Sequence, residues 1–240
     1  MNIRTEAGEM EVMSTAEKDP FAGVSERTLK YVPLYILVPV MYGAVFSTAG
    51  YAIEWAIFGL GALGWLVALF LRGPLAALVR GWPQERAKLI VGGSSGVLEE
   101  GVRLALLSLL AASFPQALSL GQGWAAIEVL LVIVNVIIIV SLIKRTDEKA
   151  MQAKQILQAQ GNLQASPLWG ILERIWASAF HIGAALIIAR TPWSAALLIP
   201  LHSGFNLAAV RLARTAALPL VSLFAAVVGL LTLAAGLLLW

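Results

Sequence analysis

The chain has 240 residues, of which 59% are hydrophobic and only 13% are charged, and its mean hydropathy is +0.82. This composition excludes a soluble globular domain and predicts an all-α polytopic membrane protein. The net charge is +3 and cysteine is absent, which excludes disulfides, thiolate zinc sites and cysteine nucleophiles.

The first thirty residues are polar and carry mixed charge. A cleavable signal peptide has its apolar region within about the first 15–30 residues, whereas here the polar segment comes first. The first apolar span is therefore predicted to remain as a signal-anchor. We expect residues 1–30 to form a mobile cytoplasmic N-terminus and residues 31–240 to form a single transmembrane helical domain. Runs of roughly 20 apolar residues, enough to cross a hydrocarbon core about 30 Å thick, predict about seven transmembrane helices at 32–51, 53–71, 90–113, 124–143, 168–189, 193–210 and 216–239.

The lysines and arginines are distributed unevenly around these spans. If seven helices alternate in direction, 14 of the 17 basic residues fall on one side. The positive-inside rule makes that side cytoplasmic, which places the N-terminus inside and Trp240 outside. We expect a multi-pass protein of a prokaryotic plasma membrane, whose basic residues face anionic lipid rather than nucleic acid. The 14 residues are Arg4, Lys18, Arg27, Lys30, Arg72, Arg80, Arg86, Lys88, Lys144, Arg145, Lys149, Lys154, Arg211 and Arg214.

Two segments outside the predicted spans have a recognisable pattern. Residues 73–88 mix apolar residues with arginines and are predicted to lie at the membrane interface. The predicted cytoplasmic loop at 145–167 contains good helix formers over 146–160 and is expected to form a helix that stops at Gly161.

Charged residues inside the third span are the strongest functional signal. Glu99 and Glu100 lie four and three residues before Arg103, so the arginine can pair with either carboxylate on one helix face. Two carboxylates beside one guanidinium leave a negative charge uncompensated, which suits a metal or a general base. The alternative is a purely structural ion-paired cluster. The preceding glycines and serines at 92–96 allow a close backbone approach or a broken helix.

The only two histidines of the chain lie in two later spans. Arg174 and His181 are seven residues apart, and His202 and Asn206 are four apart, so each pair shares a helix face. A histidine on an apolar helix is often a packing residue, but two such histidines with polar neighbours favour metal ligation. Glu128 in the fourth span is a further candidate, with a partly solvated carboxylate as its alternative.

The order of these groups resembles a known family. The pattern is similar to the YhfC family of intramembrane metalloproteases, which is related to the PrsW proteases and, more distantly, to the CAAX-prenyl proteases and bacteriocin-processing enzymes. The similarity covers about residues 90–210, and His202 with Asn206 also resembles the last motif of the CAAX group. The matching elements are Glu-Glu-x-x-Arg at 99–103, Gly-x-Gly-x-x-x-x-Glu at 121–128, Glu-Arg followed by His181 at 173–181, and then His202.

The resemblance implies a hydrolase that cleaves a membrane-anchored or membrane-spanning peptide with a glutamate-activated water and a divalent metal, for which zinc is expected. The expected metal ligands are His181, His202, Glu128 and Asn206. Glu99 or Glu100 is the expected general base, Arg103 orients this pair, and Arg174 or Asn206 stabilises the oxyanion.

One position departs from the family pattern, because Trp124 stands where a histidine is usual within the Gly-x-Gly element. A scaffold that has weakened or lost catalysis is therefore one alternative. A rhomboid-like serine protease is another, suggested by Gly93-Ser94-Ser95-Gly96, although the His-x-x-x-Asn element of rhomboids precedes the serine and here follows it. A transporter would also carry intramembrane charges, but the paired halves that are common in transporters are not evident.

Overall fold

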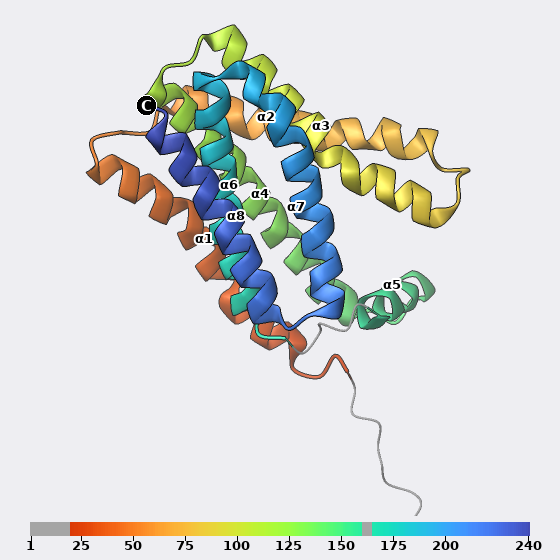
Figure 1. Cartoon of the computed structure of the whole chain (residues 1–240). Coiled ribbons are helices and arrows are strands. Elements are labelled where there is room, and N and C mark those ends of the chain that lie inside the picture. Colours follow the sequence, from red (N-terminus) through yellow and green to blue (C-terminus); the bar gives the residue numbers. More distant parts are fainter. Residues whose placement is uncertain (1–19, 160–164) are drawn as a thin grey trace, which may run out of the picture.

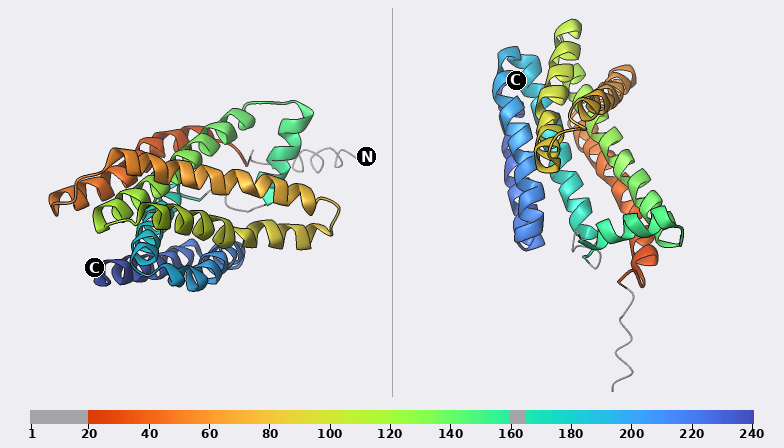
Figure 2. Two further views of the ribbon diagram at one scale, coloured as in Figure 1. Left: turned by 90° about the horizontal axis from the view of Figure 1, so that it is seen from above. Right: turned by 90° about the vertical axis from the view of Figure 1, so that its right-hand side faces the viewer.

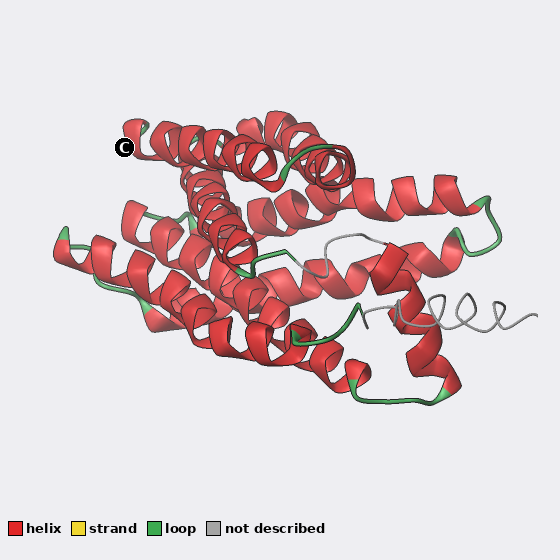
Figure 3. Cartoon of the chain, turned by 90° about the horizontal axis from the view of Figure 1, so that it is seen from below, coloured by secondary structure: helices red, strands yellow, loops and turns green. Residues whose placement is uncertain are grey.

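The computed structural model describes residues 20–159 and 165–240, in which every regular element is a helix (Figures 1 and 3). This confirms the prediction of an all-α fold. The elements are α1 (Val24–Thr48), α2 (Trp55–Leu78), α3 (Gln84–Leu110), α4 (Phe114–Ile143), α5 (Glu148–Ala159), α6 (Leu168–Arg190), the short 3₁₀ helix η1 (Pro192–Ser194), α7 (Ala195–Thr215) and α8 (Leu218–Leu238).

Six helical segments in the described ranges are long and apolar enough to cross a membrane, so the chain is a multi-pass membrane protein. These segments are α1, α2, α4, α6, η1 with α7, and α8. The third predicted span corresponds to α3, which is long enough but contains several charged residues and is not among the six. The count of seven crossings therefore stays a prediction, as does the cytoplasmic N-terminus.

Several helices extend beyond the predicted spans, and α5 agrees with its prediction. α1 begins at Val24, before the predicted start at 32, and residues 1–19 of the predicted mobile N-terminus lie outside the described residues. α5 matches the predicted helix in the 145–167 loop, although Gly161 also lies outside the described residues.

Asp147 precedes α5 and accepts a hydrogen bond from the Ala150 N–H at 3.3 Å. The side-chain hydrogen bond from Arg145 lowers the pKa of the Asp147 carboxyl.

α4 begins at Phe114, ahead of the predicted start at 124. Its first turn is closed by a capping box, in which the Ser113 N–H donates to Oε1 of Gln116 at 3.0 Å. Pro115 lies in the first turn, where a missing N–H costs nothing. The prediction started the span at 124 because residues 113–123 are too polar and glycine-rich to be read as an apolar run.

α4 and α6 pack against each other, and each of them also packs against further helices. α4 packs against α1, α2 and α6, while α6 packs against α8, and α3 packs against α2 and α7. α6 is the most enclosed of the candidate spans. α3 contacts both α6 and α7, which are the two helices that carry the histidines.

The α2–α3 turn, at residues 79–83, forms the tip of a hairpin that projects from the bundle (Figures 1 and 2). The hairpin tip contains the stretch at 73–88 that was predicted to be interfacial. It lies towards the same end of the molecule as α5, whereas the α1–α2 turn and the C-terminus lie at the opposite end (Figure 2, left). Two of the predicted cytoplasmic clusters of basic residues therefore share one end of the fold.

This arrangement leads to a topology test. We expect a reporter fused after Arg211 to read cytoplasmic and one fused at Trp240 to read external, because basic residues resist translocation. Paired alkaline phosphatase and fluorescent protein fusions at both positions measure this. A matching location for the two fusions would show that α8 does not cross the membrane.

Candidate functional site

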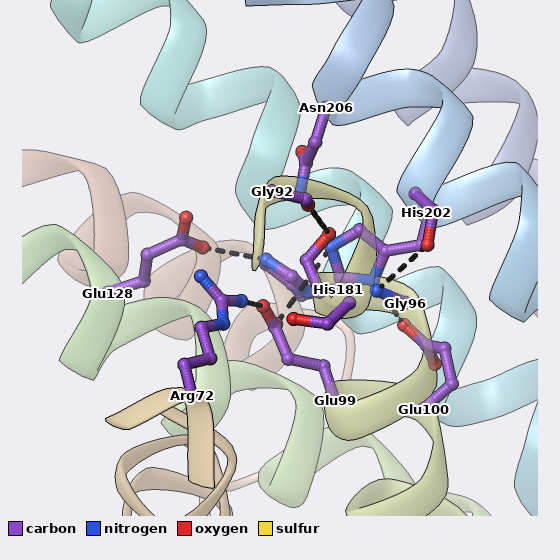
Figure 4. A network of polar contacts seen from close by, with 12 residues as sticks. Arg72, Gly92, Gly96, Glu99, Glu100, Glu128, His181, His202 and Asn206 are labelled. Atoms are coloured by element: carbon purple, nitrogen blue, oxygen red, sulfur yellow. Dashed lines mark hydrogen bonds and ion pairs between the residues drawn. The ribbon is translucent and has the colours of Figure 1, made fainter. Parts of the chain in front are cut away.

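A buried cluster of polar side chains is built from α2, α3, α4, α6 and α7 (Figure 4). Glu99 and Glu100 on α3, His181 on α6 and His202 on α7 are each at most 4% exposed. Ionisable groups at this depth are costly unless they are paired, so the partners of each group define what the cluster can do.

Glu100 connects Arg103 to His202. One of its oxygens forms an ion pair with Arg103, and Oε1 lies 2.6 Å from Nδ1 of His202. An ionised carboxylate only accepts hydrogen bonds, so Nδ1 of His202 is the protonated nitrogen. The neutral His202 ring therefore has its unprotonated nitrogen at Nε2.

His181 lies between Arg103 and Glu128. Nη2 of Arg103 is 2.9 Å from Nδ1 of His181, and Nε2 of His181 is 2.6 Å from Oε2 of Glu128. Because a guanidinium only donates, Nδ1 is the acceptor and the Nε2–H donates to Glu128. Both histidines thus have one N–H on a carboxylate and one unprotonated nitrogen, which is the usual arrangement of a metal-binding histidine.

Glu128 is fixed from its other side by Arg174. Nη1 of Arg174 lies 2.7 Å from Oε1 of Glu128, and Nη2 lies 2.8 Å from the exposed Glu173. The backbone carbonyl of Arg174 also accepts a hydrogen bond from Ser178. Arg174 therefore orients Glu128, and through it His181.

Glu99 has a different set of partners. Arg72 of α2 forms an ion pair with Oε1, and the indole Nε1–H of Trp124 donates to Oε2 at 3.2 Å. Oε2 also faces Nε2 of His202 across 3.9 Å. This is the unprotonated nitrogen of His202, so two potential ligand atoms face one another.

Three of these residues form a set with metal-binding geometry. Ligand atoms of Glu99, His181 and His202 lie within 4.8 Å of one another, and all three residues are buried. Two bonds of about 2.0–2.1 Å reach across the separation between Glu99 and His202, and two histidines with one carboxylate form a known type of catalytic zinc set. The donor chemistry therefore fits a divalent ion, which Nδ1 of His181 would bind in place of its contact with Arg103.

Arg72 corrects the predicted charge balance. From the sequence, one negative charge of the Glu99–Glu100 pair was expected to lack a partner, and Arg72 was assigned to the cytoplasmic side. In the structure α2 continues through Pro74 to Leu78, and Arg72 pairs with Glu99. Each carboxylate therefore has its own guanidinium.

Seven of the eight predicted site residues belong to one chain of contacts: Arg174, Glu128, His181, Arg103, Glu100, His202 and Glu99. The eighth, Asn206, donates to the hydroxyl of Ser95 at 3.0 Å, and Ser95 donates to the carbonyl of Gly92. Asn206 therefore packs α7 against α3 beside the cluster.

The serine alternative has no support in the described contacts. The Ser94 hydroxyl donates to the Val91 carbonyl at 2.8 Å, and Ser95 is held by Gly92 and Asn206. Neither serine is hydrogen-bonded to a histidine among the described residues, so neither has the adjacent base that a serine nucleophile needs.

The Gly-x-Gly element of α4 brings two helices close to the cluster. A Cβ on Gly121 would lie 2.8 Å from the Cα of Ile182 on α6, and one on Gly123 would overlap the carbonyl of Phe58 on α2. Only glycine permits these backbone approaches. The element therefore places Trp124 and Glu128, which follow it, between α2 and α6.

A family model described as "YhfC intramembrane metalloprotease" matches residues 34–228, which is most of the chain. No curated protein and no solved structure matches it.

Proposed function

Because this chain belongs to the YhfC intramembrane metalloprotease family, we propose that it is a metal-dependent endopeptidase of a prokaryotic plasma membrane. Its substrate in this proposal is a membrane-anchored or membrane-spanning peptide. One observation carries the proposal: each of the two histidines has one N–H on a carboxylate, Glu128 for His181 and Glu100 for His202, so its other nitrogen is the unprotonated one that a metal would bind.

His181, His202 and Glu99 would hold the ion. A divalent ion bound there supplies a water of lowered pKa and polarises the peptide carbonyl. This set differs from the one expected from the sequence, in which Glu128 and Asn206 were ligands. Glu128 instead orients His181, and Asn206 bonds to Ser95.

The two adjacent glutamates take separate roles in this proposal. Glu100 keeps His202 in the tautomer with a free Nε2, and Arg103 neutralises Glu100. Glu99 faces the centre with Oε2, so we assign to it the role of the carboxylate ligand of the ion. Arg174 is bound to two carboxylates, which makes it a positioning residue for Glu128 rather than an oxyanion donor.

A non-catalytic scaffold is the second candidate, and a specific contact favours it. Arg103 donates to the nitrogen with which His181 would bind a metal, and Arg72 neutralises Glu99. The cluster is therefore balanced in charge by its own side chains. Metal content separates the two candidates.

We expect the protein purified in detergent to contain about one equivalent of a divalent metal. His181→Ala and His202→Ala should each lose most of it, because each removes one of only three ligands. Elemental analysis by mass spectrometry measures this, together with cleavage of a membrane-anchored reporter. Asn135→Ala, which removes an exposed polar side chain from α4, is the control and should keep its metal.

Wild-type protein that contains no metal and takes none up would support the scaffold. Equal metal in both histidine variants and wild type would overturn the proposed ligand set.

A further inference from the structure

Trp124 is the largest fully buried side chain of the described residues. It lies within the cluster of charges, where a large apolar residue contributes neither a ligand nor a base. Its one polar group, the indole Nε1–H, donates to Oε2 of Glu99 at 3.2 Å. This is the same oxygen that faces Nε2 of His202 across 3.9 Å.

The orientation of the indole ring is fixed on two sides. The guanidinium carbon of Arg103 lies 4.4 Å from the ring centroid, a cation–π contact. On another side, a Cβ at Gly64 of α2 would lie 2.9 Å from Cζ3 of the ring, so the ring occupies the space that a larger residue at 64 would need. These contacts fix the direction in which the indole Nε1–H points, and that direction is towards Oε2 of Glu99.

The chemistry of the indole suits this position. An indole N–H donates and never accepts, and it carries no charge. It therefore holds Oε2 in place without competing for the ion and without cancelling the negative charge of Glu99. Arg72, which holds Oε1, does neutralise that charge and is 27% exposed at its side chain. Trp124 is the buried and uncharged one of the two groups that hold Glu99.

We propose that Trp124 is a positioning residue, whose N–H aims Oε2 of Glu99 at the nitrogen of His202 and so preorganises the metal set. This inference rests on the proposed function. It also gives a physical account of how a chain with tryptophan at this position retains a site: the residue acts on a ligand instead of being one. Hydrogen bonds to metal ligands of this kind typically change metal affinity by about 10- to 100-fold.

The test uses full-length protein in detergent, stripped with a chelator and titrated with Zn²⁺ against a chromophoric chelator. Trp124→Phe keeps a ring beneath Arg103 and removes the N–H, and we expect its zinc dissociation constant to rise by about 10- to 100-fold. Trp176→Phe removes an indole N–H that bonds to Ser222 at 3.3 Å and should bind zinc as wild type does.

A second variant covers the case in which Trp124→Phe folds poorly. Incorporation of 3-benzothienylalanine at position 124 replaces the N–H by sulfur and keeps the size of the ring, so its melting temperature should match wild type while its zinc affinity falls. Zinc binding as tight as wild type in this variant would overturn the inference. Failure of the wild type to bind zinc would instead overturn the proposed function on which it rests.

Discussion

Glu99→Gln is expected to leave the protein folded and to lower cleavage of a membrane-anchored substrate by more than about 100-fold, the upper range for changes to the hydrogen-bond partners of a metal ligand. The amide keeps the size of the side chain but has no negative charge with which to hold a divalent ion, so the variant loses one of three ligands and with it the activated water. Wild type and variant are compared by their cleavage rates, with elution in size-exclusion chromatography as the measure of folding.

Glu85→Gln is the matched control for this change. Glu85 is an exposed carboxylate of the same helix that pairs with Lys88, so the same substitution there should leave cleavage unchanged. Glu100→Gln tests the division of roles, because it weakens the hold on His202 without removing the proposed carboxylate ligand, Glu99. Wild-type cleavage by Glu99→Gln would show that Glu99 is not at the reacting centre.

Arg103→Leu is expected to lower the stability of the protein severely and to give poor expression. Arg103 and Glu100 are both fully buried at their side chains, so the substitution leaves the Glu100 carboxylate without its cation. Breaking a buried ion pair from one side costs about 3–5 kcal/mol. Thermal stability in detergent, followed by the fraction of monodisperse protein after heating, measures the effect.

The double variant Glu100→Gln with Arg103→Leu separates lost charge pairing from lost packing. It removes the unpaired carboxylate, so it should recover part of the stability that Arg103→Leu loses, which gives a favourable coupling energy in the double-mutant cycle. Arg145→Leu, at an exposed ion pair with Asp147, should have little effect. A single variant Arg103→Leu as stable as wild type would show that Glu100 is not ionised.

Local patterns were sufficient to identify most of the cluster. Glu99, Glu100 and Arg103 were found because charge in an apolar span is rare, and His181 and His202 because they share helix faces with other polar residues. Helical spacing could not pair them across helices. The spacing of residues along one helix does not show that Glu128 contacts His181 on another helix, or that Asn206 contacts Ser95.

Two features of the cluster were missed for identifiable physical reasons. The apolar run ends near Arg72 and so predicts a loop position for it, although α2 continues past Pro74. The family pattern marks Trp124 only as a missing ligand, because a sequence does not show which acceptor an indole N–H will find. The start of α4 at Phe114 was hidden for a related reason, since its capping box depends on Ser113 and Gln116, which are polar residues outside any apolar run.

The Arg72–Glu99 ion pair bears on the way the chain enters the bilayer during synthesis. Arg72, Glu99, Glu100 and Arg103 form two opposite-charge pairs within one hairpin, so these four residues would bring no net charge into the bilayer if α2 and α3 insert together. Glu128 differs, because its cationic partner Arg174 is synthesised 46 residues later, and His202 follows Glu100 by 102 residues. Insertion of α2 and α3 as a pair would therefore cost less than insertion of α4 by itself, because Glu128 meets Arg174 only once α6 has been made.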